Sequence, residues 1–223
     1  MSDITHVVWD WNGTLLHDLP LIVESVNVLL TQRDLEPIEV DDYTRLYTRP
    51  VRTFYEKLFG REIGDEEWED VDDVFHHAYA EAVDAHASLM DGAREALAAV
   101  DGSHASQSLL SMYRHELLLP LVDRFGLDEH FEVVHGLVGD PGGRKLPHLE
   151  RHLEEMVHLH GDDPTTVLVI GDAIDDALAA QHLGCRPVLL ASGSHPRAEL
   201  AATGAPVVDT LAEALAVGGV TVE

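Results

Sequence analysis

The chain has 223 residues and a formal net charge of −27, from 41 acidic side chains against 14 lysines and arginines. This length supports a sizeable core in one or two domains, and so acidic a surface argues against nucleic acid or an anionic membrane as a partner. The sequence has no run of about 18 apolar residues and no basic, then apolar, N-terminal leader, so it predicts neither a membrane span nor a secretory signal. The single Cys185 excludes an internal disulfide and favours a cytoplasmic location.

A strand is predicted over residues 4–10, where an apolar run ends at Asp10-Trp11-Asn12-Gly13-Thr14. In open α/β sheets, ligands bind just outside the carboxyl ends of the strands. We therefore expect Asp10 to face a ligand. Asn12 holds a place where a second carboxylate could act as an acid or base, which an amide cannot do.

Helical periodicity dominates from Asp18 to about His86, with apolar stripes at 21–30, 51–59 and 68–83. After residue 92, predicted helices and strands alternate, and this alternation indicates a doubly wound parallel sheet. The predicted fold is α/β: a Rossmann-like core of residues 1–16 and 88–223, with a helical cap, residues 17–87, inserted after the first strand. The predicted core strands lie at 106–111, 131–135, 166–170, 187–190 and 206–208, and the predicted core helices at 93–100, 114–125, 147–160, 174–183, 197–202 and 211–217.

A second acidic motif, Gly171-Asp172-Ala173-Ile174-Asp175-Asp176, follows the buried run 166–170. Carboxylates from two strand ends, with few nitrogen or sulfur ligands nearby, suit a hard cation such as Mg²⁺. The alternative is that the three acids stabilise the first turn of a helix through its dipole.

Two further residues stand at predicted strand-to-helix junctions. Lys145 is one of only two lysines in this acidic chain, so its place before a helix favours a functional role over a solvated one. Ser111 closes a predicted strand, where its hydroxyl and the next backbone N–H groups could hold a phosphate oxygen, although a capping serine is the alternative.

In this order and spacing the four motifs resemble those of the haloacid dehalogenase superfamily, and the helical insert resembles the cap of its phosphoglycolate phosphatase and β-phosphoglucomutase branch. The resemblance implies a phosphatase for a small phosphorylated metabolite, with Asp10 as the nucleophile that becomes an aspartyl-phosphate. It implies Mg²⁺ bound by Asp10, the Asn12 carbonyl, Asp172 and Asp176, with Asp175 the less favoured ligand.

Roles for other residues follow from the same resemblance. Lys145 would offset negative charge, Ser111 would hydrogen-bond a phosphate oxygen, and Thr14 would orient Asp10. The implied substrate-binding residues are Gly13, Ser111, Met112, Arg49 and Arg52. The arginines belong to the stretch 45–52, the expected substrate-contact loop; the alternative is that they pair with neighbouring acids.

Asn12 departs from the family pattern, because the phosphatases usually carry a second aspartate there, and such acid–base help is worth roughly 10²–10⁴-fold. The enzyme could be slow or act on substrates with good leaving groups, or it could take its proton from His17 or a cap group. It could also resemble phosphonate hydrolases, whose cap lysine could only be Lys57. A rival hypothesis is a phosphate-binding or regulatory protein of low turnover. His148 and His152 have a spacing that can bind zinc, with His158 and His160 beyond them, but no motif fixes a third ligand.

Overall fold

The computed structural model describes residues 3–48, 50–139, 144–160 and 163–220, with the backbone alone for 157–160. It has two compact units: residues 1–16 with 89–223, and residues 17–88. None of the described helices combines the length and apolarity needed to cross a bilayer.

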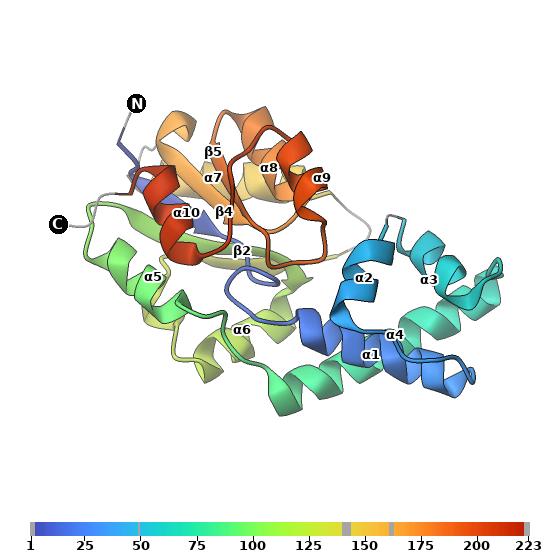
Figure 1. The fold of residues 1–223 in the computed structure, drawn as a ribbon. Coiled ribbons are helices and arrows are strands. Elements are labelled where there is room, and N and C mark those ends of the chain that lie inside the picture. Colours follow the sequence, from blue (N-terminus) through green and yellow to red (C-terminus); the bar gives the residue numbers. More distant parts are fainter. Residues whose placement is uncertain (1–2, 49, 140–143, 161–162, 221–223) are drawn as a thin grey trace. The chain divides into compact units, whose positions relative to one another are not determined.

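The first unit is built on a parallel sheet whose order in the described residues is β3-β2-β1-β4-β5-β6 (Figure 1). All its neighbouring strands pair in parallel, so their carboxyl ends meet at one edge. This is the predicted doubly wound, Rossmann-like sheet. The strands are β1 (His6–Trp9), β2 (Ser106–Arg114), β3 (Val134–Leu137), β4 (Val167–Gly171), β5 (Arg186–Leu190) and β6 (Val207–Val208).

Helices cover both faces of this sheet (Figure 1). On one face α7 packs against α8, and on the other α5 packs against α10. Strand β4 is buried along its whole length, as expected for a parallel strand covered on both faces. The helices of this unit are α5 (Ala93–Asp101), α6 (His115–Arg124), α7 (Leu146–His160), α8 (Ile174–Leu183), α9 (Arg197–Ala202) and α10 (Leu211–Gly218).

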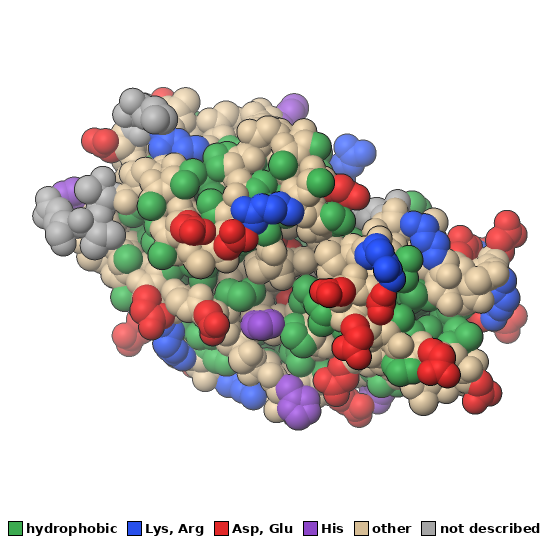
Figure 2. Space-filling view, in the orientation of Figure 1, with side chains coloured by type: hydrophobic (Ala, Val, Ile, Leu, Met, Phe, Trp, Pro, Cys, Tyr) green, Lys and Arg blue, Asp and Glu red, His purple; other side chains and the backbone are tan. Residues whose placement is uncertain are grey.

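The regular elements of the second unit, in its described residues, are all helices, and they enclose a core of their own around Val26, Leu29 and Phe54. Its longest helices, α1 and α4, pack side by side. The helices are α1 (Leu19–Gln32), α2 (Val40–Leu46), α3 (Val51–Phe59) and α4 (Asp65–His86). On the face drawn in Figure 2, acidic side chains are spread over the surface, with a smaller number of basic side chains between them.

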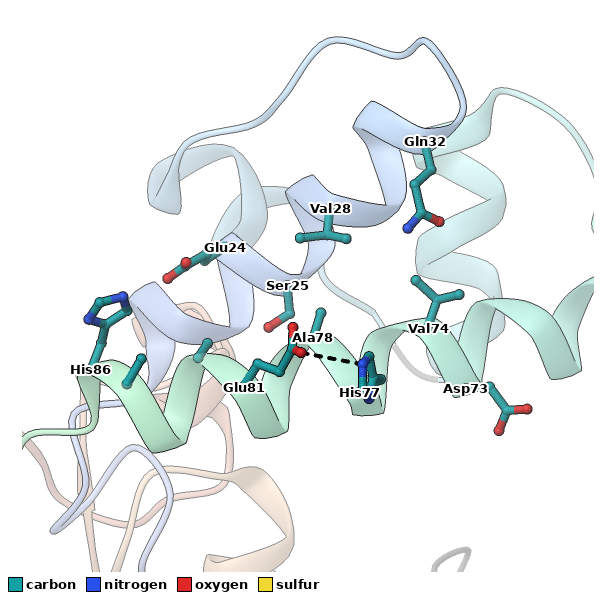
Figure 3. A pocket seen from close by; sticks show the side chains of 12 residues that line it. Glu24, Ser25, Val28, Gln32, Asp73, Val74, His77, Ala78, Glu81 and His86 are labelled. Atoms are coloured by element: carbon teal, nitrogen blue, oxygen red, sulfur yellow. Dashed lines mark ion pairs between the residues drawn. The ribbon is translucent and has the colours of Figure 1, made fainter.

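A groove of about 570 Å³ runs between α1 and α4 (Figure 3). Its floor includes Ser25, Ala78 and Ala82, and His77 pairs with Glu81 at its rim, at 3.4 Å. The groove contains none of the residues that the sequence motifs selected, so this cavity is unrelated to the predicted chemistry.

The predicted bounds of β2 and β3 are wrong. Strand β2 does not end at Ser111 but continues to Arg114, through a shift in its pairing with β3 between Leu110 and Arg114. Strand β3 covers 134–137 rather than 131–135. At Gly136 a Cβ would lie 2.7 Å from the Tyr113 carbonyl oxygen, so this glycine lets β3 extend alongside the end of β2.

Helix α2 was not predicted, and the expected contact loop, residues 45–52, is partly helical because it holds the end of α2 and the start of α3. The helix is only seven residues long, too short for a periodicity signal. Val40, Tyr43 and Leu46 nevertheless pack into the core of the second unit at helical spacing.

Candidate active site

Asp10 directly follows β1, and Asp172 directly follows the neighbouring β4. The two strands pair in register, with Trp9 opposite Ile170, so both carboxylates emerge at the same edge of the sheet. Asp176 joins them from the first turn of α8. Carboxylate oxygens of these three buried residues lie within 4.8 Å of one another, and no other such group of histidine, cysteine or acidic residues occurs in the described part of the chain.

Lys145 supplies a buried positive charge among these acids. Its ammonium group lies 2.6 Å from Asp10 Oδ1 and also pairs with Asp176 Oδ1. The side chains of Lys145, Asp10 and Asp176 are 4%, 10% and 2% exposed. One lysine therefore connects the first and fourth motifs, where solvent screens the charges little.

Burial and charge set the protonation of this cluster. Burial is the main cause that raises the pKa of Asp10 to about 7; Lys145 opposes this shift, and Asp176 adds to it. Burial lowers the pKa of Lys145, but Asp10 and Asp176 outweigh it and raise that pKa above its ordinary value. The lysine therefore stays charged, and a further cation beside Asp10 would favour the ionised carboxylate.

The acids of the α8 turn have different partners. Asp176 Oδ2 accepts a hydrogen bond of 2.9 Å from the Ala173 backbone N–H, so this residue caps the helix and also pairs with Lys145. Asp175 Oδ2 accepts a 2.5 Å bond from the backbone N–H of Lys145. Asp175 thus binds the main chain of Lys145, whereas Asp10 and Asp176 bind its side chain. No sequence signal indicated the contact with Asp175.

Glycines surround the Asp172 carboxylate. Gly13 has a φ of +69°, and a Cβ there would lie 2.5 Å from Asp172 Oδ2; at Gly193 it would lie 1.6 Å from the same oxygen. Ser192 donates a 2.7 Å hydrogen bond to the Gly13 carbonyl oxygen, which ties the loop after β5 to the turn after β1. No sequence motif indicated Ser192 or Gly193, because their part in the site depends on a contact between distant segments.

The second motif lies beside the first. Ser111 Oγ is 3.5 Å from Asn12 Oδ1, and it accepts a 3.0 Å hydrogen bond from the Tyr113 backbone N–H. Met112 is half-buried. Thr14 is fully buried, but its hydroxyl has no hydrogen-bond partner among the described residues, so the expected bond that would orient Asp10 is not seen there.

The predicted substrate-binding arginines belong to the second unit. Arg52 pairs with Asp65 at 2.7 Å and donates to the Ile63 carbonyl oxygen, which is the pairing with neighbouring groups considered as the alternative. Arg49 lies outside the described residues. Lys57 is exposed on α3.

The two described histidines that were considered as zinc ligands lie in different surroundings. His152 is fully buried and bonds to Ser108, whereas His148 is half-buried. The side chains of His158 and His160 lie outside the described residues.

A family model described as haloacid dehalogenase-like hydrolase matches residues 4–184. The chain belongs to this hydrolase family. A phosphoglycolate phosphatase of Caulobacter vibrioides is 26% identical to this hydrolase over 190 residues, which cover 84% of the chain and 79% of that protein. An N-acetylmuramic acid 6-phosphate phosphatase of Pseudomonas aeruginosa is 25% identical, covering 91% of the chain and 88% of that protein.

A solved structure described as a predicted phosphoglycolate phosphatase from Haemophilus somnus superposes on this haloacid dehalogenase-like hydrolase with a TM-score of 0.77. It is 21% identical, and the match covers 97% of this chain and 99% of that one. At this level of identity, the likeness supports the fold and carries no argument about activity.

Proposed function

We propose that the protein is a Mg²⁺-dependent phosphatase that hydrolyses a small organic phosphate monoester through an aspartyl-phosphate on Asp10. The observation that carries this proposal is the buried Lys145 ammonium group paired with both Asp10 and Asp176, with Asp172 alongside. The curated relatives act, by their names, on phosphoglycolate or N-acetylmuramic acid 6-phosphate, and both compounds are phosphate monoesters.

The donor set fits the metal. Three buried carboxylates within 4.8 Å offer only oxygen atoms, which Mg²⁺ prefers. Asp10, the Asn12 backbone carbonyl, Asp172 and Asp176 would hold the ion. When bound, Mg²⁺ would neutralise charge on the phosphate and the nucleophile and help to align them.

Residues of the protein would carry out both steps of phosphoryl transfer. A carboxylate oxygen of Asp10 attacks phosphorus, and the bond from phosphorus to the ester oxygen breaks, releasing the alcohol once that oxygen gains a proton. Water then cleaves the aspartyl-phosphate, which frees phosphate and restores Asp10. Lys145 holds Asp10 in place and offsets negative charge on the transferring group, while the Ser111 hydroxyl is available to a phosphate oxygen.

A panel of phosphate monoesters tests this proposal, including phosphoglycolate, N-acetylmuramic acid 6-phosphate and p-nitrophenyl phosphate. We expect phosphate release that requires Mg²⁺ and stops when EDTA is added. The p-nitrophenyl ester, whose leaving group needs no proton, should be favoured over its alkyl counterparts, because Asn12 offers no acid. If no ester is hydrolysed above the buffer rate at saturating Mg²⁺, the phosphatase proposal is wrong and the low-turnover binding protein takes its place.

Asp175 gives a further prediction. Asp175→Ala should lower kcat roughly tenfold with little change in KM, because a charge-assisted bond to the Lys145 backbone, worth about 1.5–3 kcal/mol, is lost. Asp175→Asn keeps an acceptor oxygen and should retain more of the activity. Steady-state kinetics of the two variants check this expectation, and equal losses in both would contradict a positioning role for the hydrogen bond.

A further inference from the structure

A chain of hydrogen-bonded histidines and serines crosses the interior of the first unit, apart from the acidic site. His6 Nδ1 lies 2.6 Å from Ser106 Oγ, and His6 Nε2 lies 2.7 Å from Ser108 Oγ. Ser108 Oγ is also 2.7 Å from His152 Nε2. The chain thus links β1, β2 and α7, and its members His6, Ser108 and His152 are fully buried.

The chain reaches the surface at His135 on β3. His152 Nδ1 lies 2.9 Å from His135 Nδ1, and His135 Nε2 lies 3.4 Å from Glu155 Oε2. The side chains of His135 and Glu155 are 31% and 50% exposed. A continuous path of polar atoms therefore joins an exposed carboxylate to the middle of the sheet.

The tautomer of His135 sets the direction of these bonds. The negative charge of Glu155, 3.4 Å from His135 Nε2, favours the neutral tautomer with the proton on Nε2, which leaves Nδ1 as an acceptor. His152 must then donate from Nδ1 and accept at Nε2 from the Ser108 hydroxyl. Ser108 in turn accepts from His6 Nε2–H, and the Ser106 hydroxyl donates to His6 Nδ1. Every donor points toward Glu155, and all three imidazoles are neutral.

Uptake of one proton at His135 Nδ1 would place two N–H groups face to face. The conflict is relieved if His152 moves its proton from Nδ1 to Nε2 and donates to Ser108. Ser108 then donates to His6 Nε2, and His6 carries its proton on Nδ1. The positive charge stays on the half-exposed His135 beside Glu155, and the two buried histidines remain neutral, which avoids the cost of a buried charge.

Burial and nearby charged groups shift the protonation of His135 and His152. Burial lowers the pKa of His135; Glu155 raises it, while His115 and Arg151 lower it further. Burial lowers the pKa of His152 to about 3, helped by His135, His6 and Lys145, so His152 itself does not become charged near neutral pH.

We propose that this hydrogen-bonded chain is a pH-sensitive switch, in which a proton bound at His135 reverses the hydrogen bonds that run from His135 to Ser106 and changes the tautomers of His152 and His6. The switch lies in the strands and helix that position Asp10, Ser111 and Lys145, since β1, β2 and α7 carry or adjoin those residues.

Nitrogen-15 NMR of histidine-labelled, full-length protein tests the switch, because ring nitrogen shifts report the tautomer directly. At pH 8 we expect the proton on Nδ1 of His152 and on Nε2 of His6 and His135. As the pH falls, His135 should take up a second proton below its ordinary range, and the tautomers of His152 and His6 should change at the same midpoint. Opposite tautomers at pH 8, or fixed tautomers while His135 titrates, would overturn the proposal.

Two surface variants should shift the pH midpoint of the His135 titration in opposite directions. Glu155→Gln should lower the midpoint by roughly half a pH unit, because a nearby negative charge is lost, and Arg151→Gln should raise it by a similar amount. Ser108→Ala should leave His6 fixed while His135 still titrates. His130, which bonds to Asp101 at 2.6 Å outside the chain, is the internal control. A midpoint unmoved by either surface variant, or a His6 that still responds without Ser108, would contradict the switch; if Ser108→Ala does not fold, the surface variants decide.

Discussion

Replacing Asp10 by asparagine is expected to abolish Mg²⁺-dependent phosphate release, to at least about 10³-fold below the wild-type rate. The amide has nearly the same shape as the carboxylate but lacks the anionic oxygen that would attack phosphorus. Lys145 keeps Asp176 as a charged partner, so the variant should still fold. Initial rates on the best ester of the panel, measured with thermal unfolding of the same samples, check this expectation.

The exposed Asp123→Asn is a matched control that removes one carboxylate outside the site. It should leave the rate unchanged. A second readout is covalent: with ³²P-labelled substrate and an acid quench, wild-type protein should retain label on Asp10, and Asp10→Asn should retain none. If hydrolysis survives in Asp10→Asn, another group is the nucleophile and the assigned mechanism is wrong.

Much of the fold follows from local patterns in the sequence. Alternating helices and short β-branched runs predicted the doubly wound sheet, which the structure confirms. Because strand ends meet at one edge, the same patterns indicated that Asp10 and Asp172 would be neighbours, and β1 and β4 do pair. Such an inference depends only on strand direction and strand order, both of which are strongly constrained in α/β proteins.

Contacts between distant segments were not predictable in this way. The bond from Lys145 to Asp175 joins residues 30 positions apart, and its geometry depends on how α7 meets α8. His152 belongs to a helix whose neighbouring residues are largely charged and exposed, so the sequence alone did not indicate that its side chain is buried. Its burial depends on Ser108 in β2 and His135 in β3, which supply hydrogen bonds that no helical pattern reveals.

Replacing Asn12 by aspartate is expected to raise the turnover of alkyl phosphates by about 10²–10⁴-fold, the usual worth of a positioned general acid. Asn12 Oδ1 lies 3.5 Å from the Ser111 hydroxyl, and Ser111 is the residue proposed to meet the phosphate. An introduced carboxyl group would therefore stand beside the reacting centre, where it could protonate the leaving oxygen and then activate water. The aryl ester p-nitrophenyl phosphate should gain much less, because its leaving group needs no proton.

The contrast between the two ester classes makes this experiment specific to proton transfer. Asn12→Ala serves as the matched control, since it keeps the backbone carbonyl, adds no acid and should not gain activity. The kcat/KM of Asn12→Asp on alkyl esters should also fall as the pH rises through the pKa of the introduced acid, and the wild type should lack this limb. Equal gains on alkyl and aryl esters would point to an electrostatic effect instead. No gain on either would show that another group already supplies the proton, and that position 12 does not limit the rate.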